Sequence, residues 1–303
     1  MMTFKRKPRT FIFTVISQEY ARLGMAWGLQ VERVTGLVPH FICADAESLQ
    51  IFSSAGFPCT AYIFDNSAIS SVEESYGDIH FPTKKAVFTV SLKFAIASKY
   101  LKAGRSVLFS DVDAIWMKNP LHEIGDIDAD FIFQPGSFPE NVKKQWGFSV
   151  CTGFFFIRSN AQTIIFSDAV HDKFDGDDQR TLNDVLIENY DIEWSSRPEK
   201  WEHCSLQNGW TKPVFGVCRK TGFSAAALAH SYYQRHAACK ETCGHAVICH
   251  PNSPKDQEEK FGTLEGLGID LEALLGSPLT GTSTPKPRGV LSRAKRVWRS
   301  RRN

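Results

Sequence analysis

Two aspartates separated by one residue, Asp111 and Asp113, are the residues of this sequence best suited to chemistry. They directly follow the apolar run Ser106–Ser110, which is typical of a buried strand. Alternate residues of an extended segment point to the same side, so both carboxylates can face a single ion. Mg²⁺ and Mn²⁺ prefer oxygen ligands, and either ion would relieve the repulsion between the carboxylates. The spacing therefore predicts a divalent metal site, and a capped turn without an ion is the alternative.

Two further groups of polar residues lie downstream and fit the same chemistry. His250 could supply a nitrogen ligand to the ion, while Lys255 and Lys260 beyond it could neutralise the charge of a leaving phosphate. Residues 176–179, Gly-Asp-Asp-Gln, precede a segment with helical periodicity. Each group also has a simpler interpretation, because a histidine beside prolines is common in loops and an acidic pair stabilises a helix N-terminus.

The order of the expected elements shows where these groups lie in the fold. Apolar runs rich in β-branched and aromatic residues alternate with segments of helical periodicity. We expect strands at Thr10–Ile16, His40–Cys43, Ala61–Phe64, Ser106–Ser110, Phe131–Phe133 and Phe154–Ile157, and helices over 19–34, 45–55, 83–100, 161–173 and 178–190. This alternation predicts an α/β fold with a mostly parallel sheet that helices cover on both faces. Ligands of such sheets bind at the carboxyl ends of the strands, where Asp111 and Asp113 lie.

The composition is that of a folded globular protein with charged extensions. The 303 residues are 43% hydrophobic and 22% charged, and 23 phenylalanines and 7 tryptophans are available for a core. We expect one domain over residues 10–275, a basic leader at 1–9, and a linker rich in Pro, Ser and Thr with a basic tail at 276–303. The net charge of +2 then combines a mildly acidic domain with cationic ends.

The basic tail favours contact with an anionic membrane surface, because Val290, Leu291, Val297 and Trp298 lie among its cations. A solvated, disordered tail is the alternative, and no nucleic-acid partner is expected. The sequence shows no signal-peptide pattern and no apolar run of the ~18 residues that span a membrane. We therefore expect a cytoplasmic location, peripheral at a membrane, or the Golgi lumen if the chain is a fragment of an anchored eukaryotic protein.

Eight cysteines are present, and five of them lie between residues 204 and 249. Because no signal peptide is seen, the expectation is that they are reduced thiols. One alternative is a zinc site formed by His236, Cys239, Cys243 and His245, although their spacing matches no standard ligand pattern. The other alternative is a local disulfide, as in a lumenal protein.

The sequence around the aspartate pair resembles a known family. Val107–Trp116, followed by Asn119-Pro120, is similar to the central signature of the nucleotide-diphospho-sugar transferases, GT-A-fold glycosyltransferases that include plant cell-wall xylosyl- and arabinosyltransferases. Other pieces occur in family order: Lys93 on the preceding helix, Thr152–Asn160, Asp178-Gln179 with Leu182-Asn183, Asn208-Gly209, and His250-x-Asn252 with Glu259-Lys260. The resemblance covers residues 10–265. Two positions depart from the pattern, since Cys151 stands where Asn is usual and Asp256 where Gly is common.

The resemblance implies a GT-A (Rossmann-like) fold and a metal-dependent glycosyltransferase. Its donor would be a nucleotide-diphosphate sugar, expected to be a UDP-sugar, and its acceptor a glycan or other molecule, with retention of anomeric configuration. It implies that Asp111, Asp113 and His250 bind Mn²⁺ or Mg²⁺. It implies donor contacts from Asp111, Asp113, Lys93, Thr152, Gly153 and Lys255, the last of these near the diphosphate. Asp178 is then the candidate catalytic carboxylate, with Gln179 beside it.

Two other functions are compatible with parts of this pattern. A phosphohydrolase of the haloacid-dehalogenase type also places Asp-x-Asp after an apolar strand, and it requires a later acidic pair such as Asp177-Asp178. That motif usually opens the chain, whereas here it begins only at residue 111. The second alternative is a non-catalytic sugar-nucleotide-binding scaffold that its basic tail recruits to a surface. The intact aspartate pair and His250 argue against it.

Overall fold

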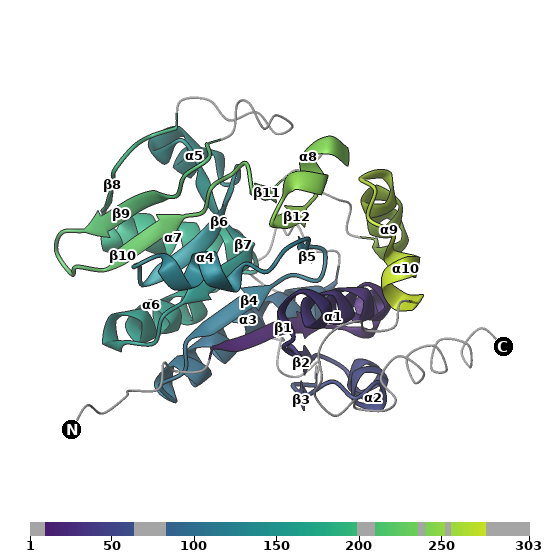
Figure 1. Ribbon diagram of the computed structural model, residues 1–303. Helices are drawn as coiled ribbons and strands as arrows, with labels where there is room; N and C mark the ends of the chain where they lie inside the picture. Colours follow the sequence, from purple (N-terminus) through teal and green to yellow (C-terminus); the bar gives the residue numbers. More distant parts are fainter. Residues whose placement is uncertain (1–9, 64–82, 199–209, 236–239, 252–255, 277–303) are drawn as a thin grey trace, which may run out of the picture.

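A nine-stranded sheet runs through the molecule, and a three-stranded sheet lies beside it (Figure 1). The computed structural model describes residues 10–63, 83–198, 210–235, 240–251 and 256–276. The strands of the large sheet are, in spatial order, β3 (Cys59–Ala61), β2 (His40–Cys43), β1 (Phe11–Ile16), β4 (Val107–Ser110), β7 (Ser149–Ile157), β6 (Phe131–Gly136), β10 (Ser224–Ala227), β9 (Val214–Cys218) and β8 (Ile192–Trp194). Among these strands, β7 and β9 run against the direction of the others.

The three-stranded sheet joins segments that are far apart in the chain. Its order is β11 (Tyr233–Arg235), β12 (Ile248–His250) and β5 (Ile115–Trp116). The central strand β12 runs parallel to β11 and antiparallel to β5. Because β5 begins two residues after Asp113, this pairing brings the C-terminal part of the chain to the end of β4 (Figure 1).

Helices surround both sheets, and local chemistry explains several of their ends. They are α1 (Ala21–Thr35), α2 (Ala46–Ser54), α3 (Lys84–Lys102), α4 (Leu121–Asp126), α5 (Glu140–Trp146), α6 (Ala161–Asp172), α7 (Asp178–Tyr190), α8 (Lys240–His245), α9 (Gln257–Gly266) and α10 (Leu271–Gly276), with a 3-10 turn at Gln18–Tyr20. Asp45 caps α2 by accepting the N–H of Ser48, and Asn160 forms a reciprocal capping box with Thr163 at α6. Gly36 ends α1 in the left-handed conformation that favours glycine.

Alternate residues of the central strands point into two hydrophobic cores. Ile12 and Ile16 of β1 belong to a core shared with α1 and α2, whereas Phe13 belongs to a core shared with α3, α6 and α7. In β4, Leu108 faces the first core and Phe109 the second. The large sheet is therefore covered on both faces, which explains why its central strands are almost entirely apolar.

Most of the expected elements are confirmed, with boundaries shifted by a few residues. The third strand occupies Cys59–Ala61 rather than Ala61–Phe64. Its register is set by β2, because Phe41 lies opposite Cys59 and its N–H donates to the carbonyl of Pro58 at 2.9 Å. The strands β5, β8, β9, β10, β11 and β12, each two to five residues long, were not predicted from the sequence.

The expectation of reduced thiols is wrong for one pair, because Cys243 and Cys249 form a disulfide. The turn between α8 and β12 places their Cα atoms 5.4 Å apart, within the range that a disulfide requires. The zinc alternative would have used Cys243, and two of its other residues, His236 and Cys239, lie outside the described residues. The free cysteines of the described part are Cys43, Cys59, Cys151 and Cys218.

The predicted leader at 1–9 and almost all of the predicted linker and basic tail lie outside the described residues. Their contact with a membrane surface therefore stays a prediction from charge. Within the described part of the chain, no helix combines the length and the apolar character needed to cross a membrane.

Candidate functional site

Asp111 and Asp113 lie where β4 ends, beside β7. The N–H of Asp111 donates to the carbonyl oxygen of Gly153 at 2.7 Å, and the N–H of Ala114 donates to the carbonyl of Asp111 at 3.1 Å. The second hydrogen bond closes a turn. The aspartate pair is therefore not in the extended segment that the sequence predicted. The two carboxylates nevertheless converge, and they do so on His250.

His250 supplies the third donor of this group from the end of β12. One carboxylate oxygen of each aspartate and one ring nitrogen of His250 lie within 4.8 Å of one another. Donors that share one small divalent ion at ~2.1 Å lie up to roughly 4 Å apart, so a small adjustment would complete the site. The residues therefore fit the Mn²⁺ or Mg²⁺ predicted from the sequence.

Gln134 on β6 holds the His250 ring in a useful orientation. Its Oε1 lies 2.8 Å from Nδ1 of His250, while Oδ1 of Asp113 lies 3.3 Å from Nε2. In the tautomer whose Nδ1–H donates a hydrogen bond to Gln134, the Nε2 lone pair is available to an ion beside Asp113. Burial and then Arg235 lower the pKa of His250, but Asp113 and the Cys151 thiol together raise it more, so that the net pKa is above its ordinary value.

Two lysines balance the carboxylates. Lys93 Nζ on α3 lies 3.1 Å from Oδ1 of Asp111 and 2.8 Å from Oδ2 of Asp178, and Lys260 on α9 pairs with Asp113. Burial raises the pKa of Asp113, but Lys260 opposes this effect and the pKa ends well below its usual range. Burial lowers the pKa of Lys93, and its two carboxylate partners more than reverse that shift. The carboxylate of Asp113 thus stays ionised in a buried position because a cation lies beside it.

Gly153 allows the backbone of β7 to approach the donor group. A Cβ atom at this position would lie 2.3 Å from Cε1 of His250 and 2.8 Å from Oδ2 of Asp111, far inside normal contact. Glycine is therefore required here by space rather than by backbone conformation. The preceding residue, Thr152, is buried and lines the same cavity.

Asp178 and Gln179 begin α7 on the other side of Lys93. Asp177 caps this helix, since its Oδ1 accepts the N–H groups of Gln179 at 3.0 Å and Arg180 at 2.9 Å. The capping interpretation of the acidic pair thus applies to Asp177, which leaves the buried carboxylate of Asp178 to contact Lys93. The side-chain amide of Gln179 donates to the carbonyl of Phe138.

These groups line one cavity of about 910 Å³. Of the predicted site residues, it contains Lys93, Asp111, Asp113, Thr152, Gly153, Asp178, Gln179 and His250. The remaining one, Lys255, lies outside the described residues. Eight residues that are spread over more than 150 positions of the chain are thus brought to one place.

Lys260, which the sequence suggested as a cation for a leaving phosphate, does lie at the donor group, because it pairs with Asp113. Three further residues of the site were not predicted from the sequence. Arg235 lines the cavity because β11 places it opposite His250 in the register. Tyr20 also lines the cavity, and burial, followed by Asp113, raises its pKa to about 12. Gln134 lies in an apolar strand, where no local pattern distinguishes it.

Cys151, which replaces the usual asparagine, is buried beside the donor group. Its Sγ accepts the N–H of Gly153 at 3.4 Å. Burial raises the pKa of this thiol, but Arg235 and then His250 lower it more, so that the net pKa is below its usual value. Cys151 has no side-chain amide, but its sulfur atom still makes a polar contact with the backbone of Gly153.

Comparison with known proteins identifies the family. A model of the nucleotide-diphospho-sugar transferase family matches residues 38–264. The chain is 30% identical over 161 residues to the beta-arabinofuranosyltransferase RAY1 of Arabidopsis thaliana, covering 52% of this chain and 29% of that protein. It is 31% identical over 147 residues to the UDP-galactose:fucoside alpha-3-galactosyltransferase of Dictyostelium discoideum, covering 41% and 22%. The chain spans less than a third of the length of either relative.

Solved structures show partial likeness. Mouse xyloside xylosyltransferase 1 is 11% identical with a TM-score of 0.41, over 59% of this chain and 82% of that chain. The galactosyltransferase LgtC, solved with donor and acceptor sugar analogs, is 15% identical with a TM-score of 0.39, over 57% and 70%.

The family match covers most of the chain and includes every described site residue from Lys93 to Lys260. It contradicts the phosphohydrolase alternative, and the helix-covered sheet confirms the α/β class expected from the sequence. The chain therefore belongs to the nucleotide-diphospho-sugar transferase family.

Proposed function

We propose that this chain is a divalent-metal-dependent glycosyltransferase that moves a sugar from a UDP-sugar to a glycan acceptor with retention of configuration. The observation that carries the proposal is the convergence of Asp111, Asp113 and His250 in one cavity with Lys93 and Asp178. A cavity of about 910 Å³ has the size of a small-molecule site. The two curated relatives bear the names of glycosyltransferases.

Asp111, Asp113 and His250 are the proposed ligands of Mn²⁺ or Mg²⁺, which when bound would supply positive charge to the donor diphosphate. Lys260 lies beside Asp113 at the edge of this group. Its ammonium is therefore close to where negative charge develops on a leaving diphosphate, and a fixed cation there favours departure of the leaving group. The sequence suggested both Lys255 and Lys260 for this role, and the contact with Asp113 supports Lys260.

Asp178 is the proposed carboxylate at the transferred sugar. Its contact with Lys93 at 2.8 Å holds it in place, and Asp177 relieves it of helix capping. In a transfer with retention, a carboxylate beside the anomeric carbon can stabilise the positive charge that develops there. Gln179 belongs to the same wall of the cavity and is fixed by its bond to the carbonyl of Phe138.

The decisive test measures release of UDP from UDP-galactose and from UDP-arabinofuranose, with and without Mn²⁺ and with a panel of glycan acceptors. Asp113→Asn should lower the rate of transfer on the order of a thousandfold, because it removes a metal ligand and the partner of Lys260. Asp128→Asn is the matched control, since the side chain of Asp128 is fully exposed.

A non-catalytic sugar-nucleotide-binding scaffold would give a different result in the same experiment. The wild-type chain would bind Mn²⁺ and UDP without turnover of any donor, and Asp113→Asn would abolish only binding. Transfer that is independent of divalent metal and unchanged in Asp113→Asn would contradict the proposed site.

The location and the membrane contact are also proposals. A buried disulfide persists in oxidising compartments, which favours the lumenal alternative over the cytoplasmic one. Contact of the basic tail with an anionic surface is tested by sedimentation with phosphatidylserine vesicles. A variant with the arginines of residues 286–302 changed to glutamine should lose such binding.

A further inference from the structure

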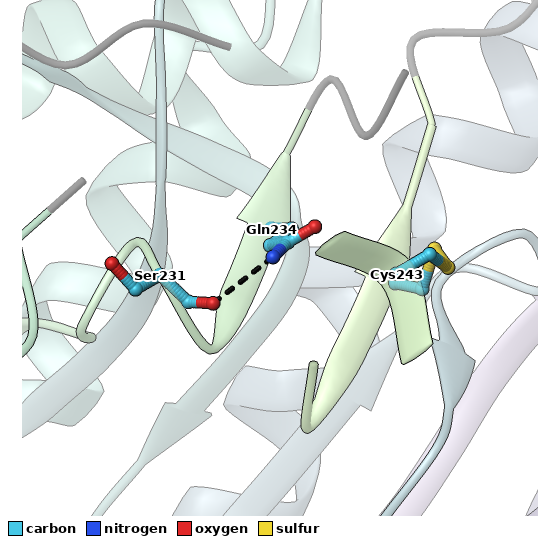
Figure 2. The surroundings of a disulfide bond; sticks show 4 residues. Ser231, Gln234 and Cys243 are labelled. Atoms are coloured by element: carbon cyan, nitrogen blue, oxygen red, sulfur yellow. Dashed lines mark hydrogen bonds between the residues drawn. A yellow bond between two sulfur atoms is a disulfide. The ribbon is translucent and has the colours of Figure 1, made fainter. Parts of the chain in front are cut away.

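The Cys243–Cys249 disulfide lies one residue before His250. It joins α8 to β12, and both cysteines are fully buried (Figure 2). The chemistry at the cavity does not use either sulfur atom, so a bond at this position calls for another explanation. The proposed metal site depends on where β12 places the imidazole that follows the bond.

The pairing of β12 shows why Cys249 matters for His250. On one side of β12, Ile248 and Cys249 pair with Trp116 and Ile115 of β5, and the pairing ends there. His250 is paired only with Arg235 on the other side. Cys249 is thus the last residue of the strand that is held from both sides, and it sets the direction in which the chain reaches the donor group.

The turn that leads into β12 is already well bonded through its backbone. The N–H groups of Val247 and Ile248 donate to the carbonyl of Tyr232, and the N–H of Met117 donates to Val247. Gln234, which lies opposite Cys249, donates from Nε2 to the carbonyl of Ser231 at 3.0 Å (Figure 2). These bonds hold the start of β12, whereas the disulfide holds its last doubly paired residue.

Only a small displacement of the His250 ring is compatible with its contacts. Its two ring nitrogens contact Gln134 at 2.8 Å and Asp113 at 3.3 Å, and the ring is nearly inaccessible to solvent. A residue with partners on both sides of its ring binds an ion well only if its backbone is held to within a fraction of an ångström. A strand of three residues provides few backbone bonds for this purpose.

We propose that the Cys243–Cys249 disulfide is a positioning element of the metal site, which holds His250 in register with Asp113 and Gln134. This inference rests on the proposed metal-dependent function. Reduction by a dithiol, such as dithiothreitol or a thioredoxin-like protein, breaks the S–S bond. The protein gains two electrons and two protons as two thiols, and the reductant becomes a disulfide. The reduced protein keeps its three ligands but binds the ion more weakly.

The test compares Mn²⁺ binding by isothermal titration calorimetry in the oxidised wild type, the reduced wild type and Cys243→Ala/Cys249→Ala. We expect the Kd for Mn²⁺ to rise about tenfold in the reduced protein and in the double variant, as it does when partners of a ligating histidine are lost. Reductant should have no further effect on the double variant. Cys218→Ala, a buried free cysteine on β9, should bind like the wild type.

A spectroscopic readout separates positioning from general stability. Pulsed EPR of bound Mn²⁺ should show nitrogen modulation from His250 in the oxidised wild type, and this modulation should weaken in the double variant. His250→Gln should lack it in both redox states. Far-UV circular dichroism and the Tm in EDTA report whether the variants remain folded.

Several results would overturn the inference. Equal Kd values and equal nitrogen modulation in oxidised, reduced and double-variant proteins would show that the disulfide does not position His250. Unfolding of both the reduced wild type and the double variant would show that the bond serves the whole fold instead. Failure of the oxidised wild type to bind Mn²⁺ would contradict the proposed function itself.

Discussion

The large sheet and the three-stranded sheet hold their site residues by different means. Asp111 and Asp113 follow β4, which pairs with β1 and β7 and is buried along its whole length. His250 ends the three-residue strand β12, where it is paired only with β11, because the pairing with the two-residue strand β5 stops at the disulfide-bonded Cys249. Both strands are buried, but β4 is paired on both sides along its length, whereas His250 is paired on one side only.

This difference locates the sensitive part of the site. Changes in the apolar strands should lower the stability of the whole domain, since they affect both cores. Changes at the seam between the sheets should affect the metal site while the domain remains folded. The seam is defined by Gly153, Gln134 and Lys260, which contact His250 or the aspartates from β7, β6 and α9.

Among changes that leave the three proposed metal ligands intact, the largest effect is expected at Lys260, which lies on α9 rather than on either sheet. Lys260→Gln should lower kcat by roughly a few hundredfold, because it removes a fixed cation from the position of the leaving diphosphate. Lys255→Gln is the informative comparison and should change kcat much less. Steady-state kinetics with the accepted UDP-sugar measures both. A larger loss in Lys255→Gln would instead favour Lys255 at the diphosphate, as the family resemblance implied.

The next largest effect should come from separating the two sheets at Gly153. Gly153→Ala would push β7 away from His250 and Asp111, and kcat/KM should fall by about a hundredfold. Gly125→Ala on α4 is the control, since an added Cβ there meets no atom within 4 Å. Wild-type activity in Gly153→Ala would mean that His250 and the aspartates do not bind one shared metal ion.

A smaller effect is expected where Gln134 orients the imidazole. Gln134→Leu should weaken Mn²⁺ binding about tenfold, because Nδ1 of His250 loses its acceptor. Gln134→Glu keeps an acceptor at this position and should restore much of the affinity. The exposed Gln50 on α2 provides the control substitution Gln50→Leu. Calorimetric titration with Mn²⁺ measures all three, and equal affinities would exclude an orienting role.

The last comparison concerns pH, which acts on His250 without changing any side chain. The raised pKa of His250 means that its ring holds a proton at higher pH than usual, and an ion must displace that proton. Affinity for Mn²⁺ should therefore fall as the pH drops below this pKa, by at most about tenfold per pH unit. Asp113 does not contribute, because its pKa is far lower. In His250→Gln, titrations between about pH 8 and pH 6 should lose this dependence.

Much of the site could be predicted because its signals are local. An aromatic-rich strand running into Asp111 and Asp113 predicted both the buried position and the metal chemistry, whereas the roles of Asp178 and Gly153 came from the resemblance to the family. The helices over 161–172 and 178–190 were also predicted within a residue, since periodicity and capping are properties of neighbouring residues.

The sequence by itself determined that apolar strands alternate with helices, and that carboxylates follow the strand from which they reach the cavity. Only the tertiary structure decided which partners meet them. The bond between Gln134 and His250 joins positions 116 residues apart, and Lys260 reaches Asp113 across 147 residues. Such contacts depend on how the two sheets pack and on the disulfide before His250, and neither leaves a periodic pattern in the chain. Local interactions therefore determine where the helices and strands form. Contacts between residues far apart in the sequence determine the geometry of the metal site.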